Sequence, residues 1–396
     1  MSNRRFHFRF QTLALVVVIS VFAMNSKCGC IEISGYYENT LLQEYTEDGY
    51  DNLSNASKLR VNIDAGQGDE LTFTGNVNFI SHHLNVNYDL KSYLPETVIV
   101  DLTRKGIPTE FMVEKNRIFL DNAYLTLRFS GMRLRAGRQQ LSWGSGYGFN
   151  PTDLFHRKDM LDPTYEKEGV NALRLDHNWG IGGNLSGIIV PGRKLSSSGY
   201  ALKLGTHASK IGYDIGLTIH HIEDSTSLDS ESYEILTQQR TALGLDLNGS
   251  LFGMGVWMEG NFNLMEVESN FSRIVTGFDY TLENGLYLMF EGMYDERSQN
   301  SDSYTARDWM EYIQFGEPIS RYRYMVGIKQ SFLELAEGSL FIFGGNDGSY
   351  FLNPRVDVSI SQNADMTIFG AASLGDAEGQ FTSGSYSVTG RISVYF

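Results

Sequence analysis

Five arginines in the first half of the chain have the residue type and the spacing to bind an anion. They are Arg128, Arg133, Arg135, Arg138 and Arg174. Alternate residues of a β-strand point to the same face, so Arg133 and Arg135 are expected to lie side by side. A guanidinium group binds a carboxylate or a phosphate through two parallel hydrogen bonds. If the segments that carry them are neighbouring strands, these arginines form one positively charged wall.

The histidines and cysteines offer little for metal or catalytic chemistry. Four of the eight histidines occur as adjacent pairs, at 82–83 and 220–221, and neighbouring strand residues point to opposite faces, so each pair offers one ligand per side. Both cysteines, Cys28 and Cys30, lie near the N-terminus, which leaves the body of the chain without a cysteine-ligated metal site or a haem-attachment motif. No motif isolates a nucleophile beside a base. We therefore expect no metal site, no cofactor and no enzymatic activity.

Apolar and polar residues alternate through the chain from residue 31 onward. Leu59, Val61 and Ile63 alternate with charged and polar residues, and segment 385–396 repeats the pattern up to the last residue. A period of two is typical of a strand whose two faces meet different surroundings. Eighteen such segments can be marked, with approximate ranges 31–46, 55–66, 70–87, 116–129, 132–142, 169–179, 182–191, 198–207, 210–222, 237–248, 251–264, 270–282, 284–296, 320–333, 337–346, 350–361, 364–373 and 384–396.

The connections between these segments alternate in length. The short ones are expected at Gly66–Asp69, Ser130–Gly131, Gly180–Ile181, Ala208–Ser209, Gly249–Ser250, Glu283–Asn284, Leu335–Ala336 and Gln362–Asn363. The longer ones are expected at 88–115, 143–168, 223–236, 297–319 and 374–383. This alternation and an even strand count are typical of a transmembrane β-barrel with short periplasmic turns and longer extracellular loops. We predict an all-β chain that forms a single antiparallel barrel of about eighteen strands over residues 31–396.

The N-terminus has the pattern of a secretory signal peptide. Three arginines precede an apolar run at 13–24, and small residues follow the run. We predict a cleaved signal peptide over residues 1–30, with lipid attachment at one of the two cysteines as the open alternative. A secreted barrel belongs in the outer membrane of a Gram-negative-type bacterium. The formal net charge of −15 excludes a generally basic nucleic-acid-binding protein.

In such a barrel one face of each strand meets lipid and the other lines the interior, or lumen. The alternation places four of the five arginines on the lumenal face, and a bulge at Gly137 would turn Arg138 inward too. The alternative is that these arginines pair with lumenal acids such as Asp121 and Asp176. Farther around the wall, basic and acidic residues are mixed, which favours an internal lattice of ion pairs. The residues concerned are Lys203, Arg240, Arg273, Arg321, Arg323, Lys329, Arg355 and Arg391 with Asp214, Asp246, Glu259, Asp279, Glu291, Asp357 and Asp365.

A glycine-rich segment follows the arginine-bearing strands. It opens the connection 143–168, which is long enough to fold into the barrel mouth, as is the connection 88–115. The residues predicted to narrow the barrel there are Trp143, Tyr147, Phe149 and Asp153.

The stretch 120–155 carries a family resemblance. Its sequences Gly137-Arg138-Gln139, Trp143-Gly144 and Asn150-Pro151-Thr152-Asp153 resemble a broad group of outer-membrane porin-like proteins that includes the alginate-export porins and related uncharacterised barrels. The resemblance implies a barrel that passes a polar or anionic solute, with arginines in the pore and loops that narrow it.

The C-terminal strand ends on Phe396, preceded on the same face by Val394 and Ile392. This ending resembles the signal that the bacterial barrel-assembly machinery reads. It implies that machinery as a partner, together with the lipid bilayer and lipopolysaccharide.

These patterns predict an outer-membrane porin for passive diffusion or export of small polar solutes, anions among them, through an arginine-lined lumen. The alternative is a structural barrel that sheathes an electron-transfer cytochrome, or one that anchors or exports surface polysaccharide. The sequence leaves the solute, the direction of transport and the oligomeric state open.

Overall fold

The structure is a computed structural model of the chain. It describes residues 30–396, apart from gaps at 47–48, 50, 85–86, 93, 113–114, 156–167, 181, 230–231, 301–303, 376–377 and 382–384. Nearly all of the predicted signal peptide and part of the predicted loop 143–168 lie outside the described residues.

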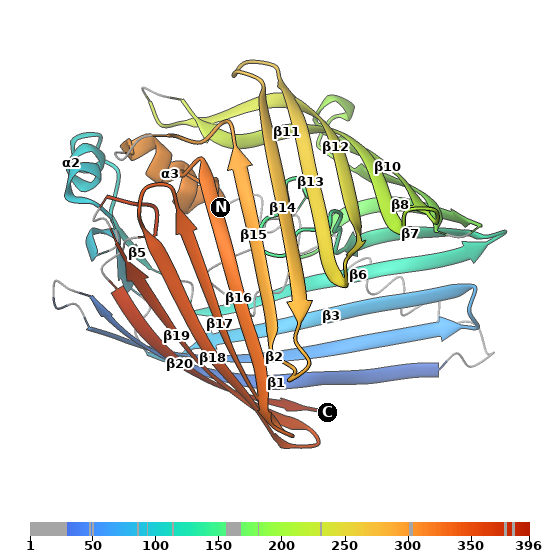
Figure 1. Ribbon diagram of the computed structural model, residues 1–396, viewed down its shortest axis with the longest axis horizontal. Helices are drawn as coiled ribbons and strands as arrows, with labels where there is room; N and C mark the ends of the chain where they lie inside the picture. The colour runs from blue at the N-terminus through green and yellow to red at the C-terminus, as the bar shows by residue number, and fades with distance from the viewer. Residues whose placement is uncertain are drawn as a thin grey trace.

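Eighteen strands form one closed antiparallel barrel (Figure 1). Each strand pairs with the next in the chain, and β1 pairs with β20, where Tyr36 lies opposite Tyr395. The prediction of a single eighteen-stranded barrel is confirmed, and every strand overlaps its predicted range. The strands are β1 (Cys30–Thr46), β2 (Asp51–Gln67), β3 (Leu71–His82), β6 (Asn116–Phe129), β7 (Met132–Gln139), β8 (Val170–Trp179), β9 (Gly183–Val190), β10 (Gly199–Ala208), β11 (Tyr213–Leu228), β12 (Ile235–Leu251), β13 (Met254–Met265), β14 (Phe271–Thr281), β15 (Tyr287–Asp295), β16 (Tyr322–Leu333), β17 (Ala336–Gly345), β18 (Tyr350–Ser361), β19 (Ala364–Leu374) and β20 (Ser385–Tyr395).

The alternation in the sequence separates an apolar outer surface from a polar interior. On β11, Leu217 and Ile219 are 52% and 44% exposed, whereas Thr218 and His220 are buried. A soluble protein buries its apolar residues, so this reversed arrangement is that of a barrel whose outer surface meets lipid. Closure leaves no strand edge unpaired, which a hydrocarbon environment requires.

The short turns gather at one end of the barrel. Ser130 and Gly131 have φ angles of 46° and 76°, and Phe252 and Gly253 have 53° and 81°. Two consecutive positive φ angles are the conformation of a two-residue hairpin turn that matches the strand twist. The turn predicted at Gly249–Ser250 is therefore wrong by three residues, because β12 continues to Leu251 and Gly253 takes the position that favours glycine.

The longer connections contain short elements that the alternation did not predict. The connection between β3 and β6 holds β4 (Asn87–Asp89), η1 (Leu90–Ser92), α2 (Glu96–Arg104) and β5 (Glu110–Met112). The connection between β15 and β16 holds α3 (Ala306–Phe315), and that between β9 and β10 holds η2 (Leu195–Ser197). Most of the predicted loop 223–236 is strand, because β11 runs to Leu228 and β12 begins at Ile235. In the described part of the chain, no helix has the length and apolar character needed to cross a membrane.

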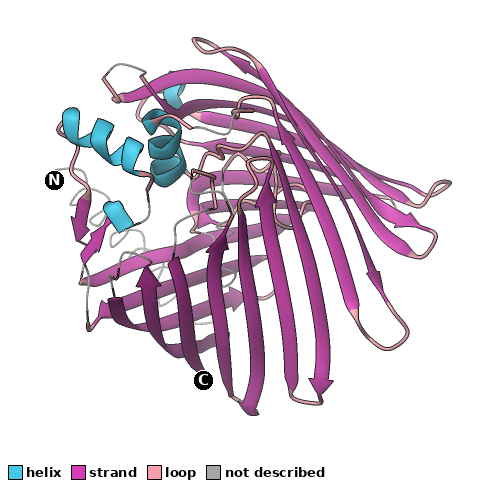
Figure 2. Cartoon of the chain, turned by 60° about the vertical axis from the view of Figure 1, so that its left-hand side comes forward, coloured by secondary structure: helices cyan, strands magenta, loops and turns pink. Residues whose placement is uncertain are grey.

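Helices α2 and α3 pack together across the mouth at the long-loop end, and we call this pair the outer cap (Figure 2). Their shared core includes Val98, Leu102 and Trp309, all of which are at most 3% exposed. Ten strands separate the two connections in one direction around the barrel and eight in the other. The two helices therefore come from nearly opposite sides of the wall, and their contact spans the opening.

Candidate functional site

A second connection crosses the barrel interior. Residues 140–155 follow β7 and fold into the lumen, and we call them the inward loop. At one side Leu141 and Trp143 pack against Ile188 on β9. At the other side Phe149 joins an apolar cluster that includes Met325 on β16. The loop therefore bridges two parts of the wall, and the residues predicted to narrow the barrel lie on it.

Glu259 on β13 holds both ends of the loop through neutral donors. Its Oε2 accepts hydrogen bonds from the backbone amides of Ser145 and Gly146, at 2.7 and 3.0 Å. Its Oε1 accepts from the amide and the hydroxyl of Thr152, at 2.7 and 2.8 Å. Every one of these donors belongs to the inward loop.

Glu291 on β15 holds the middle of the loop. Its Oε2 accepts from the amide of Tyr147 and from the indole of Trp257, both at 2.7 Å. Its Oε1 accepts from the amides of Gly148 and Phe149, at 2.8 and 2.7 Å. We call the two carboxylates and their loop donors the amide clasp.

Glycines allow the backbone to approach these carboxylates. Gly144 has a φ of 94°, and a Cβ there would lie 2.6 Å from a carboxylate oxygen of Glu259. A Cβ on Gly146 would collide with the carbonyl of Phe149, and one on Gly148 would lie 2.7 Å from the sulfur of Met325. The alternating glycines at 144, 146 and 148 are therefore the sequence signal of the clasp.

The clasp differs from the ion-pair lattice to which both glutamates were assigned in the sequence. Both side chains are fully buried, and no arginine or lysine pairs with either carboxylate among the residues that the structure describes. Buried carboxylates need hydrogen-bond donors or opposite charges. Here six backbone amides, a hydroxyl and an indole supply them, and residue types alone do not reveal backbone donors.

The predicted arginine wall is partly assembled on β6, β7 and β8. Arg133 lies opposite Arg128 on β6 and opposite Asp176 on β8, and Arg135 lies opposite Arg174. Arg133 and Arg174 both pair with Asp176, at 3.2 and 2.8 Å.

Arg135 has a different environment from its neighbours. Its guanidinium carbon lies 5.6 Å from the ring centroid of Tyr124, and its buried Nε has no hydrogen-bond partner among the described residues. Within the described chain, Asp176 therefore pairs with Arg133 and Arg174, while Arg135 has no carboxylate partner. With three arginines and one acid, this part of the lumen carries an excess of positive charge.

The other two predicted arginines are held elsewhere. Arg128 donates to the carbonyl of Asp69 at 2.9 Å, at the short-turn end of the barrel. Arg138 pairs with Glu168 at 3.5 Å. The predicted bulge at Gly137 is wrong: β7 pairs without a register shift from Met132 to Arg138, although Gly137 has a φ of 129°.

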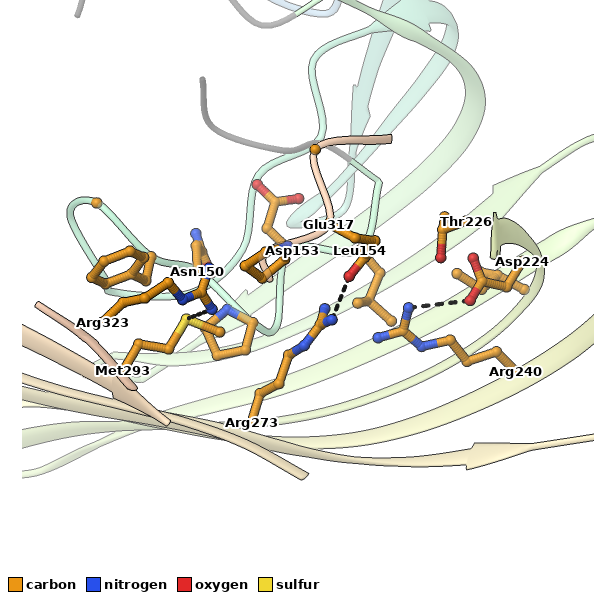
Figure 3. A pocket seen from close by; sticks show the side chains of 16 residues that line it. Asn150, Asp153, Leu154, Asp224, Thr226, Arg240, Arg273, Met293, Glu317 and Arg323 are labelled. Atoms are coloured by element: carbon orange, nitrogen blue, oxygen red, sulfur yellow. Dashed lines mark hydrogen bonds and ion pairs between the residues drawn. The ribbon is translucent and has the colours of Figure 1, made fainter. Parts of the chain in front are cut away.

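A second arginine set, assigned only to the mixed wall by the sequence, surrounds a cavity of about 120 Å³ beside the inward loop (Figure 3). Arg240, Arg273 and Arg323 come from β12, β14 and β16 and are at most 8% exposed. Each is paired with acids: Arg240 with Asp224 at 3.5 Å, Arg273 with Glu317, and Arg273 and Arg323 with Asp295 at 2.9 and 3.5 Å. The three arginines belong to the predicted ion-pair lattice, but their acid partners Asp224, Asp295 and Glu317 were not assigned to it.

The closed eighteen-strand barrel is the fold of outer-membrane porins. OccAB4 of Acinetobacter baumannii matches with a TM-score of 0.57 at 9% identity, over 94% of this chain and 99% of that chain. The outer membrane protein OpdK of Pseudomonas aeruginosa matches with a TM-score of 0.57 at 9% identity, over 93% and 98%. The structure of OpdK with vanillate matches with a TM-score of 0.55 at 10% identity, over 92% and 98%. No protein-family model and no curated protein sequence matches the chain.

Proposed function

We propose that this protein is an outer-membrane channel through which small polar solutes, anions among them, diffuse passively. The observation that carries the anion preference is that, among the described residues, one lumenal carboxylate, that of Asp176, pairs with Arg133 and Arg174 and leaves the adjacent Arg135 without an acid partner. Excess positive charge on a low-dielectric wall attracts anions and repels cations. Arg135, whose guanidinium has no carboxylate partner among the described residues, is the group best placed to meet a passing anion.

The comparison with OpdK is consistent with this class of solute. That protein has been solved with vanillate, which is an aromatic carboxylate. The resemblance of segment 120–155 to the porin-like group implies a polar or anionic solute, which includes carboxylates. We therefore propose organic carboxylates as the solute class, without choosing between monomers and polymers.

The inward loop favours a channel over a sheath. A barrel that encloses an electron-transfer cytochrome needs a lumen wide enough for a second protein, whereas here residues 140–155 bridge the interior from β9 to β16. A loop that narrows the lumen suits selection among small solutes.

The experiment is the reversal potential of single channels in a salt gradient, with the double variant Arg133→Ala/Arg135→Ala. We expect the wild-type channel to prefer anions. The variant is expected to lose most of that preference, because the group of Arg133, Arg135 and Arg174 loses its two charges on β7. Arg355→Ala is the matched control, since Arg355 lies on β18 and is paired with Asp357 at 2.6 Å. An unchanged anion preference in the double variant would refute the proposal that these arginines select anions.

A further inference from the structure

We propose that Glu259 and Glu291 are positioning residues that set the size limit of the channel by holding the inward loop across the lumen. This inference rests on the proposed channel function. It adds a mechanism for selection by size, which is separate from the selection by charge assigned to the arginines.

The hydrogen bonds of the clasp are arranged to fix a backbone. Five consecutive amides, from Ser145 to Phe149, point at two carboxylates on strands β13 and β15. Hydrogen bonds to an ionised acceptor are roughly twice as strong as those between neutral groups. The wall therefore dictates the path of the loop backbone, and the packing of Trp143 and Phe149 against the wall adds to it.

The held segment presents Tyr147 to the lumen. Glu291 binds the backbone amide of Tyr147, and this residue is 56% exposed. Its two sequence neighbours, Gly146 and Gly148, have no side chains that could cover it. Its ring centroid lies 5.2 Å from that of Trp257, whose indole binds the same carboxylate. Because the clasp fixes the Tyr147 backbone and the indole beside the Tyr147 ring, loss of the clasp is expected to let this exposed ring shift.

The alternative role for the Glu259 and Glu291 carboxylates is purely electrostatic: their charges would act directly on ions in the lumen. Neither carboxylate contacts the lumen, since both side chains are fully buried beneath the loop. Replacement by glutamine keeps the size of each side chain, but it turns one acceptor oxygen into an NH₂ donor that faces N–H donors. A glutamine variant therefore opposes the clasp while it fills the same space.

The first test is the permeability of Glu259→Gln/Glu291→Gln channels to a series of anions of increasing size. We expect a severalfold rise in conductance and admission of anions that the wild type excludes. The matched control is Glu337→Gln, which removes a lumenal carboxylate paired with Lys329 at 2.9 Å and distant from the loop. This control is expected to alter charge preference alone.

The second test does not require conduction. Ser145→Cys places a thiol where the buried hydroxyl of Ser145 lies, in a background with Cys28→Ser and Cys30→Ser. We expect a small maleimide to label this thiol severalfold faster in the glutamine variant than with an intact clasp. If the double variant fails to fold, each single glutamine variant is expected to give part of the same increase.

The outcomes separate the two proposals. A folded wild-type barrel that does not conduct contradicts the channel function, while faster labelling in the glutamine variant still supports the clasp. A folded glutamine variant with wild-type size limit and wild-type labelling rate overturns the clasp proposal and leaves the channel function standing.

Discussion

At the residue scale, the buried glutamates and the arginines of the lumen have different kinds of partner. Glu259 and Glu291 bind backbone amides of the inward loop, whereas Arg133, Arg135 and Arg174 face a single acid, Asp176. Backbone amides, a hydroxyl and an indole satisfy the two glutamates, so neither carboxylate needs an arginine partner.

Removal of one ring tests whether the clasped segment limits the pore. Tyr147→Ala keeps the backbone amide that binds Glu291, since that hydrogen bond does not involve the side chain. We expect a higher single-channel conductance than in the wild type, with a smaller rise than for Glu259→Gln/Glu291→Gln. Tyr147→Phe keeps the ring and is the matched control. Equal conductance for the alanine variant and the wild type would show that Tyr147 does not obstruct the pathway.

The candidate site could be predicted from residue types only in part. The arginines on β7 and β8 were selected because charged residues alternate with apolar ones there, and Trp143 and Phe149 because they lie in a glycine-rich connection. The clasp was missed because its donors are backbone groups, which every residue type but proline carries. The assignments of Ile392, Val394 and Phe396 to an assembly signal, and of residues 1–30 to a signal peptide, stay predictions.

At the scale of elements, the outer cap depends on an ion-pair cluster at its base. Arg307 on α3 pairs with Glu268 at 2.9 Å, and Arg297 pairs with Glu311 on α3 at 3.3 Å. Glu311 also accepts a hydrogen bond from the amide of Leu228, at the end of β11. These contacts join α3 to the connection between β13 and β14 and to the end of β11.

Acid is expected to loosen α3 through Glu268. Burial opposes ionisation of this carboxyl, but the hydrogen bond from Ser227 and the charges of Arg297 and Arg307 outweigh it and hold the pKa of Glu268 below its ordinary value of 4.5. A carboxylate with a lowered folded-state pKa contributes stability that is complete above its unfolded-state pKa and is lost as pH falls through the folded-state pKa. We therefore expect amide hydrogen exchange in Ala306–Phe315, corrected for intrinsic rates, to accelerate as the pH falls below about 4.5.

Two substitutions check the origin of that change. Glu268→Gln is expected to remove much of the acid-dependent acceleration of hydrogen exchange in α3, because the variant lacks the Glu268 charge already at neutral pH. Glu96→Gln, on the exposed start of α2, is expected to leave the profile unchanged. A profile that Glu268→Gln does not alter would assign the acid sensitivity to other groups.

The two helices mark the limit of the alternation as a predictor of elements. The strands have a period of two because lipid and lumen impose it, so all eighteen could be predicted. Helices α2 and α3 span nine and ten residues inside long connections. These connections do not separate lipid from lumen, so no period of two is imposed on them. Their own signals are local: Thr305 and Asp308 form a capping box, and Gly316 ends α3 with a φ of 65°.

At the scale of the whole molecule, the space that the barrel encloses is crossed at two different levels. The inward loop bridges the interior, and the outer cap bridges the mouth, each joining strands that lie far apart around the circumference. The outer surface is apolar, which places the wall itself in a lipid bilayer.

The lipid-facing surface is tested by one charge on β11. Leu217, the fifth residue of this strand, is 52% exposed on its apolar face. Leu217→Arg is expected to cost up to about 2–4 kcal/mol of folding free energy, the typical cost for arginine at the bilayer midplane. The measurement is reversible unfolding in liposomes. Leu195→Arg, at an 81% exposed position in the connection between β9 and β10, is expected to be neutral. Equal losses at the two positions would contradict a lipid-facing β11.

The most direct test of the central claim is the single-channel conductance of the refolded wild-type protein in a planar bilayer, with reversal potentials recorded in a salt gradient. Passive diffusion of anions through an arginine-lined lumen predicts steady conductance with a reversal potential displaced toward the anion equilibrium potential. A correctly folded barrel that carries no current, or one that prefers cations, would contradict it.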